Sequence, residues 1–254
     1  MKWFVNEGSI VRDIWGKADT ILFIFAGASA EFALNKSVDW LYFTGKLPAD
    51  PLGRLFSTVG YARQIVFAEY DDAMRAIRQI ASIHQGVERS RNARIPDSAY
   101  RDVLFMLIDY SIRSFELLER KLTIAEKEEI FEVFHAVGEG MGVPGLPGDL
   151  REWERMRAAH LQENLVRSHF TVDLYKQYRK HLGGFRYYLL RHVQMRLVPQ
   201  KVNNLIGLGS DRLLGILLPV YKISRWIGAG AYLRNLLLPE EYKMQVIRLD
   251  EAGH

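Results

Sequence analysis

Three side chains that can do chemistry fall at helical spacings in the first third of the chain: Arg54, Thr58 and His84. Arg54 and Thr58 are four residues apart, so a helix would place both on one face. His84 follows Ile77 by seven residues and precedes Val87 by three, which is typical of the buried stripe of a helix. An imidazole that points into an apolar interior can bind haem iron. The spacing therefore predicts an inward histidine that follows an inward arginine and threonine.

Each of these residues also has a purely structural interpretation. A single inward histidine on a helix is more often a hydrogen-bonded core residue than a ligand. A buried Arg54 needs a partner, which would be a bound anion or a carboxylate such as Asp50 or Asp109. The hydroxyl of Thr58 can donate to a bound group or back to the carbonyl oxygen of Arg54.

Several short motifs accompany these residues. They are an apolar helix at 21–34, DPLGRL at 50–55 with Thr58, IASIHQGV at 80–87, the helix start LTIAE at 122–126 and the turn GVP at 142–144. In this combination the sequence, over roughly residues 15–209, resembles the catalytic domain shared by MpaB-type oxygenases and latex-clearing rubber oxygenases. The resemblance implies a haem-b-dependent oxygenase that acts with dioxygen on an apolar, isoprenoid or lipid-like substrate.

The resemblance also implies roles for individual residues. His84 stands where haem-bearing members have the proximal ligand of the iron, and Arg54 and Thr58 stand where an arginine and a threonine line the site. Arg89 follows soon after His84, and its guanidinium fork suits a haem propionate at the pocket rim. A solvated loop is the alternative for this arginine.

Rubber-cleaving members use a glutamate as a base near the iron, and Glu31 and Asp39 are the nearby acids of this chain. Glu31 follows Gly27 by four residues on an apolar helix, so we expect it to face inward with a raised pKa and to act as acid or base. Many members carry a His-Pro pair where this chain has Asn35 and Lys36. That departure favours a second hypothesis, a non-catalytic helical scaffold that binds a lipid, a membrane surface or a protein partner.

Helical periodicity dominates the chain and predicts an all-α, bundle-like fold. The family resemblance adds the expectation of an apolar cofactor pocket within it. The predicted helices are 19–34, 37–44, 51–68, 71–87, 96–119, 123–140, 149–165, 172–182, 185–197, 211–227 and 240–247. We expect a single domain over residues 1–254, with a weak seam at 199–209 and a helical appendage at 203–254.

Composition narrows the function classes further. The chain of 254 residues has no cysteine, which excludes disulfides and the covalent attachment of a c-type haem. No nucleophile elbow, phosphate-binding loop or dinucleotide fingerprint occurs, so hydrolase, kinase and nicotinamide chemistry have no support. We find no secretory signal and no apolar run of spanning length, and therefore expect a cytoplasmic protein.

Charge is unevenly distributed along the chain. Residues 176–248 contain 13 Lys or Arg and three acids, a balance of +10, which leaves −6 for the rest because the net charge is +4. A solvated basic face is one interpretation, and peripheral contact of this basic C-terminal third with a membrane is the other. The apolar run LLGILLPVY at 213–221 would contribute to such contact. Nucleic acid is not expected as a partner, because no binding motif accompanies the cations.

Overall fold

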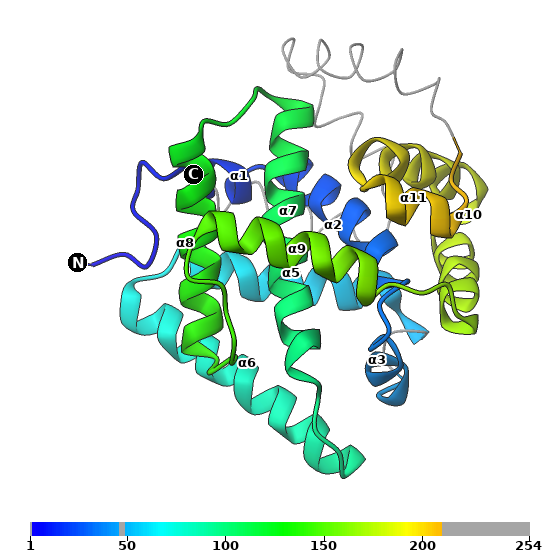
Figure 1. Ribbon diagram of the computed structural model, residues 1–254, viewed down its shortest axis with the longest axis horizontal. Coiled ribbons are helices and arrows are strands. Elements are labelled where there is room, and N and C mark those ends of the chain that lie inside the picture. Colours follow the sequence, from blue (N-terminus) through cyan, green and yellow to red (C-terminus); the bar gives the residue numbers. More distant parts are fainter. Residues whose placement is uncertain (1, 46–48, 210–254) are drawn as a thin grey trace.

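The computed structural model describes residues 2–45 and 49–209, and every regular element in these ranges is an α-helix (Figure 1). The helices are α1 (Ile10–Gly16), α2 (Ala18–Phe32), α3 (Asp39–Phe43), α5 (Pro51–Val66), α6 (Tyr70–Arg91), α7 (Asp97–Leu118), α8 (Ile124–Gly140), α9 (Leu150–Glu163), α10 (His169–Leu197) and α11 (Gln200–Ile206). Between these helices the described chain has two isolated β-bridges and no strand. The prediction of an all-α fold is confirmed.

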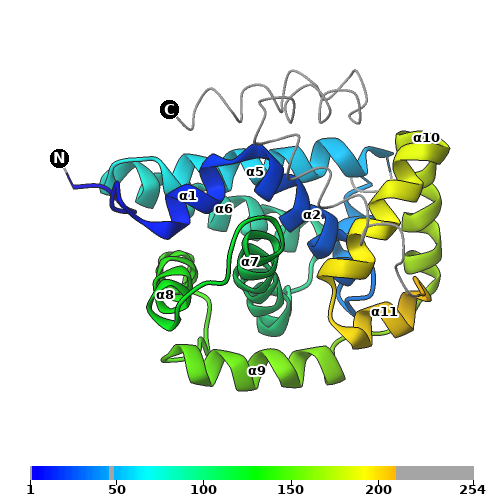
Figure 2. The same ribbon diagram turned by 90° about the horizontal axis from the view of Figure 1, so that it is seen from above.

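Helices α2 and α7 form the centre of the molecule and share its most extensive helix contact. In Figure 2, α9 lies on one side of α7, α1 and α5 lie on the opposite side, and α8 runs beside it. The main core contains Trp15, Ile21, Ile24, Tyr110 and Ile130, all fully buried. Burial of such large apolar side chains is the dominant stabilising contribution to a fold of this size.

A glycine permits the close approach of the two central helices. A β-carbon at Gly27 of α2 would overlap the ring of Tyr110 of α7. The Tyr110 ring therefore packs directly against the backbone of α2, and its hydroxyl reaches Glu31 one turn further along that helix. Close packing of these two helices thus sets the position of a buried carboxylate.

Local side-chain chemistry fixes where several helices begin. Asp50 caps α5 by accepting from the Gly53 N–H at 2.8 Å, and Pro51 occupies the first helical position. The predicted capping box of α8 is present, because Thr123 and Glu126 each bond the other's backbone N–H. These caps position the two helices from within their own sequences.

The structure differs from the predicted helices in three places. The predicted helices 172–182 and 185–197 are the two halves of α10, which bends at Gly183, where φ is 73° and ψ is 171°. Only glycine adopts this backbone conformation readily. Helices α1 and α11 were not predicted, and α11 occupies the segment that was interpreted as a seam.

The predicted helices 211–227 and 240–247, the run at 213–221 and most of the predicted appendage lie outside the described residues. Among the residues that are described, no helix combines the length and the apolar character that crossing a membrane requires.

Candidate functional site

An apolar cavity of about 360 Å³ lies between α2, α5, α6 and α7, with further walls from α8 and α10. Most of its described lining residues are aliphatic or aromatic, among them Phe25, Phe32, Ile80, Met106 and Phe134. Its volume falls in the range of about 300 to 1,000 Å³ that is usual for small-molecule and cofactor sites. A cavity of this character suits an apolar or flat aromatic ligand.

The three residues predicted to form the site line this one cavity. Arg54 and Thr58 come from α5, which Asp50 and Pro51 start, and His84 comes from the middle of α6. Helices α5 and α6 pack against each other, so the inward faces of both meet at the cavity. The structure thus brings together side chains that lie 30 residues apart in the chain.

The imidazole of His84 is held without a hydrogen bond to its Nδ1 atom. This atom is buried and has no partner among the described residues. Burial, followed by the positive charge of Arg54, lowers the pKa of His84, while Glu88 acts in the opposite direction. The ring packs edge-on against Tyr100, with centroids 5.3 Å apart. His84 is therefore neutral near pH 7 and is oriented by packing.

Arg54 and Thr58 differ in how their polar groups are satisfied. The Thr58 hydroxyl donates to the carbonyl oxygen of Arg54 at 3.2 Å, which is the structural interpretation of this threonine. Neither Asp50 nor Asp109 forms an ion pair with Arg54, and no other acid of the described chain does so. Arg54 is the one cationic side chain among the described lining residues, which include no acid. The cavity thus offers one positive charge to a ligand.

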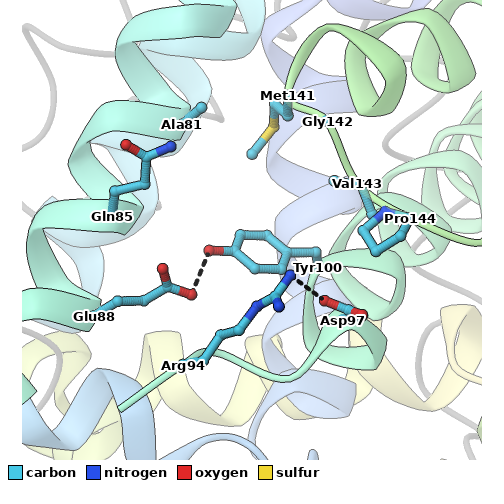
Figure 3. A pocket seen from close by; sticks show the side chains of 10 residues that line it. All are labelled: Ala81, Gln85, Glu88, Arg94, Asp97, Tyr100, Met141, Gly142, Val143 and Pro144. Carbon is cyan, nitrogen blue, oxygen red and sulfur yellow. Dashed lines mark hydrogen bonds and ion pairs between the residues drawn. The ribbon is translucent and has the colours of Figure 1, made fainter. Parts of the chain in front are cut away.

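Tyr100 lines the cavity and also a smaller, polar pocket of about 130 Å³, whose lining residues are shown in Figure 3. Tyr100, Met141 and Val143 line both spaces. The Tyr100 hydroxyl donates to Glu88 Oε1 at 3.4 Å, and the same oxygen accepts from the Ile95 N–H at 2.8 Å. Burial, with Glu88 as the second cause, raises the pKa of Tyr100 to about 12. Tyr100 therefore stays protonated, and its ring contacts the His84 imidazole while its side chain also lines the polar pocket.

Glu31 lies in a different environment, a buried group of charged residues that we call the Glu31 cluster: Glu31, Asp102, Asp109, Arg157 and His160. Arg157 binds both oxygens of Glu31 in a bidentate pair and donates to Asp109 Oδ2 at 2.8 Å. His160 Nε2 lies 3.0 Å from Glu31 Oε1, and His160 Nδ1 pairs with Asp102. Every carboxylate of the cluster has a cationic partner.

The expected rise of the Glu31 pKa is wrong. Burial does act to raise it, but the charge and hydrogen bonds of Arg157, together with His160, outweigh burial and lower the pKa to about 2. Burial likewise acts to lower the pKa of His160, but hydrogen bonds to Asp102 and Glu31 raise it overall. Glu31 is thus ionised at neutral pH and is absent from the described cavity lining.

Charges balance within this region only when His160 is protonated. Arg113 Nε also donates to Asp109 Oδ1 at 2.7 Å. The three carboxylates of the cluster are therefore paired with three cationic groups, which are Arg157, Arg113 and protonated His160. The Tyr110 hydroxyl completes the shell of Glu31 by donating to Oε2 at 2.9 Å. A fully paired set of buried charges is typical of a structural core element.

Comparison with protein families gives one match. Residues 18–234 match the family described as the catalytic domain of ER-bound oxygenase mpaB/B′ and rubber oxygenase. The chain belongs to this oxygenase family. Comparison with curated proteins and with solved structures gives no match.

Two arginines near the end of α6, unlike His84, are not among the described residues that line the cavity. Arg89 is exposed in the last turn of α6 and does not line the cavity. Arg91, two residues further, donates to Asp39 Oδ2 at 2.6 Å and stacks over Trp40 with its guanidinium carbon 4.0 Å from the ring centroid. Trp40 does line the cavity. The Asp39 carboxylate, the other acid considered as a base, is thus paired with an arginine at the cavity wall.

Asn35, at the position where the resemblance led us to expect the histidine of a His-Pro pair, contributes to both regions. Its side chain lines the cavity, its Nδ2 donates to Asp102 Oδ2 at 2.9 Å, and its Oδ1 accepts from the Ser37 N–H at 2.8 Å. Both ends of the amide are used in fixing the turn after α2. Asn35 therefore has a structural role in this member of the family.

Sequence reasoning missed the contribution of α7 to the cavity. Ala99, Val103 and Leu107 of α7 line it at intervals of four residues, with Tyr100 beside them. That interval is a helical stripe, so the signal was present in the sequence. Val103 is 38% exposed, so this part of the cavity wall reaches the surface of the described chain.

Proposed function

We propose that this family member binds haem b in the apolar cavity, with His84 as the iron ligand, and acts as an oxygenase on an apolar, isoprenoid or lipid-like substrate. One observation carries the proposal: His84, Arg54 and Thr58 line the same cavity. Family membership supports the reaction class, and the character of the lining supports the substrate class.

The residues present fit a haem group. Its iron needs a neutral imidazole in an apolar setting, and His84 has a lowered pKa and a buried ring nitrogen without a partner in the described chain. Haem propionates need cationic partners, and the guanidinium of Arg54 at the cavity wall forms no ion pair with an acid of the described residues. A buried polar atom left without a partner costs about 1 to 3 kcal/mol, so a ligand that satisfies such groups binds more favourably.

The roles of the chain are to bind and to orient. Bound haem supplies the iron that reacts with dioxygen, which is chemistry that protein side chains lack. Tyr100 holds the His84 ring by edge-on packing, and Arg54, which lines the cavity, would bind a haem propionate. Phe25, Phe32 and Phe134 exclude water and give an apolar substrate a surface to pack against. The Glu31 carboxylate stays ionised and paired, so we assign it no proton transfer.

Haem titration of the purified protein tests this proposal. We expect a Soret band for the wild type, its loss in His84→Ala, and its return when imidazole is added to His84→Gly. His135→Ala is the matched control, because His135 is a partly exposed histidine of α8 outside the described cavity lining. His160 is unsuitable as a control, since its removal would unpair Glu31 and Asp102. Equal haem spectra for the wild type and His84→Ala would refute the assignment.

A second candidate function is a non-catalytic scaffold that binds an amphiphile such as a fatty acid. The described lining is mostly apolar with Arg54 as its one permanent cation, which suits a carboxylate head and an aliphatic tail. The use of both ends of Asn35 in structural bonds also favours it. A protein that takes up no haem but binds a fluorescent fatty acid, with weaker binding in Arg54→Met, would support this alternative.

A further inference from the structure

The apolar cavity reaches the surface of the described chain along α6. Ile83 lines the cavity and is 42% exposed, and Val103 of α7, which also lines it, is 38% exposed. Val87 and Arg91 follow Ile83 at intervals of four residues, so these three residues share one side of α6. Val87 lines the cavity too, whereas Arg91 contacts α3. The row of α6 side chains that borders the opening therefore ends at α3.

Helix α3 forms the adjoining part of the cavity wall. Trp40 and Thr44 of this helix line the cavity, and Phe43 is 48% exposed. In the view of Figure 1, α3 lies at the edge of the molecule. It has only five residues and no side-chain cap at its start. Helices shorter than about 12 residues are unstable on their own, so the position of α3 depends on its side-chain contacts with other helices.

Arg91 joins α3 to α6. Its Nη2 atom donates to Asp39 Oδ2 at 2.6 Å, and its guanidinium carbon lies 4.0 Å from the ring centroid of Trp40 and 5.3 Å from that of Phe43. The side chains of Arg91 and Asp39 are 26% and 35% exposed. A partly solvated ion pair and a cation–π contact are each weak, so this attachment can break and form again.

The attachment of α3 to α10 is of a different kind. The Tyr42 hydroxyl donates to Asp173 Oδ2 at 3.0 Å, and the Tyr42 ring lies 4.5 Å from that of Phe170. Tyr42 also packs against a buried apolar cluster that contains Val38 and Leu174. Apolar burial holds more firmly than a partly exposed ion pair. Tyr42 is thus the more stable anchor of α3, and Arg91 is the contact that can release.

We propose that α3 is the gate of the apolar cavity and that Arg91 holds this gate closed. When Arg91 releases Asp39 and Trp40, α3 turns about its anchor at Tyr42 and widens the opening beside Ile83. Arg91 is a positioning residue, because it acts on a ligand only through Trp40. The proposal depends on the cavity and on no particular cofactor, so it is independent of haem binding.

The exchange kinetics of an apolar probe test the proposal. The probe is N-phenyl-1-naphthylamine, an uncharged aromatic molecule that fluoresces in apolar surroundings, mixed with the full chain in a stopped-flow instrument. Arg91→Met should raise the association and dissociation rate constants together by roughly tenfold, as expected for the loss of one ion pair and one cation–π contact. The dissociation constant should change by less than about threefold, because the closed state is destabilised equally with and without the probe.

The matched control is Arg89→Met. Arg89 is an exposed arginine of the same helix and lies outside the described cavity lining. This variant should exchange the probe like the wild type. Unchanged rate constants in Arg91→Met, or equal acceleration in Arg89→Met, would overturn the proposal. Failure of the wild type to bind the probe would overturn it as well, because a gate requires a cavity that molecules enter.

A cross-link tests the gate in the opposite direction. The chain has no cysteine, so Asp39→Cys with Arg91→Cys introduces the only pair of thiols that a short bismaleimide can join. The cross-linked protein should exchange the probe several times more slowly than the same variant capped with N-ethylmaleimide. Equal exchange by the two forms would refute the gate. Haem enters neither measurement, so failure of the gate and failure of the proposed function are distinguishable.

Discussion

The cavity and the Glu31 cluster lie against different faces of α2, and they differ in whether their polar groups have partners within the described chain. In the Glu31 cluster each buried carboxylate meets a cation, and Arg157 bonds two acids at once. In the cavity Arg54 has no acid among the described residues, and His84 keeps a buried nitrogen without a partner. Paired charges hold a fold together, whereas unpaired polar groups around an empty space indicate a ligand from outside the chain.

The largest effect should come from breaking the Glu31 cluster. Arg157→Met leaves Glu31 and Asp109 without their shared cation, and we expect the free energy of unfolding to fall by about 3 to 5 kcal/mol. Urea denaturation followed by far-ultraviolet circular dichroism measures it. Arg155→Met on the exposed face of α9 is the control, with an expected change within about 0.5 kcal/mol. Similar losses for both variants would contradict a special role of Arg157.

The second prediction concerns pH and His160. Because its folded pKa is raised above the unfolded value of 6.5, protonated His160 stabilises the fold fully below pH 6.5. That stabilisation is lost as the pH rises through the folded pKa. Glu31, with its pKa lowered from 4.5 to about 2, contributes stability above pH 4.5 that is lost as the pH falls towards 2.

Unfolding free energies measured across this pH range test the assignment of the charges. His160→Gln should be destabilised by about 1 to 3 kcal/mol at pH 6 and should lose the decline in stability on the alkaline side. His135→Gln should keep the wild-type profile, since His135 lies on the partly exposed side of α8. If the free energy of unfolding of His160→Gln fell with rising pH as it does in the wild type, the fall would be due to another titratable group.

The third prediction concerns Arg54 of the cavity, which is replaced by methionine as Arg157 of the Glu31 cluster was above. Arg54→Met removes a partly exposed guanidinium that pairs with no described acid, so we expect stability to change by less than about 1 kcal/mol. Haem uptake should weaken, because a propionate would lose its cation. Urea denaturation and haem titration of the same sample separate these two effects. A loss as large as that of Arg157→Met would reveal a structural partner of Arg54.

An equally small effect on stability is expected from filling the cavity. Ala62 of α5 lines it, and Ala62→Leu adds apolar atoms to empty space, so stability should change by less than about 1 kcal/mol. The same change should prevent haem uptake by occupying the space that the cofactor needs. Ala159→Leu, on the exposed side of α9, should leave both properties unchanged. Undiminished haem uptake by Ala62→Leu would place the cofactor elsewhere.

The sequence was sufficient to predict which candidate side chains face inward, because the signals for this are local. Arg54 and Thr58 lie on a helix whose start is fixed by Asp50 and Pro51, and His84 lies in a helical stripe with Ile77. Each of these features is readable within one helix. That the two helices meet at one cavity followed only from the family resemblance.

The Glu31 cluster could not be predicted in this way. The helical spacing of Glu31 indicated burial correctly, but Arg157 and His160 lie 126 and 129 residues away in the chain. Burial alone raises a carboxylate pKa, and only knowledge of the partners reverses the sign. Helix periodicity indicates which side of a helix faces inward, but it does not identify the residues of other helices that contact that side.

Asn35 makes the two regions mechanically dependent on each other. This amide borders the cavity and donates to Asp102, which in turn binds His160 on α9, a helix that contributes no described residue to the cavity. A ligand that displaces the Asn35 side chain would therefore also change the contacts of His160 on α9, through two consecutive polar contacts. We expect hydrogen exchange of the α9 amides to report on whether the cavity is filled.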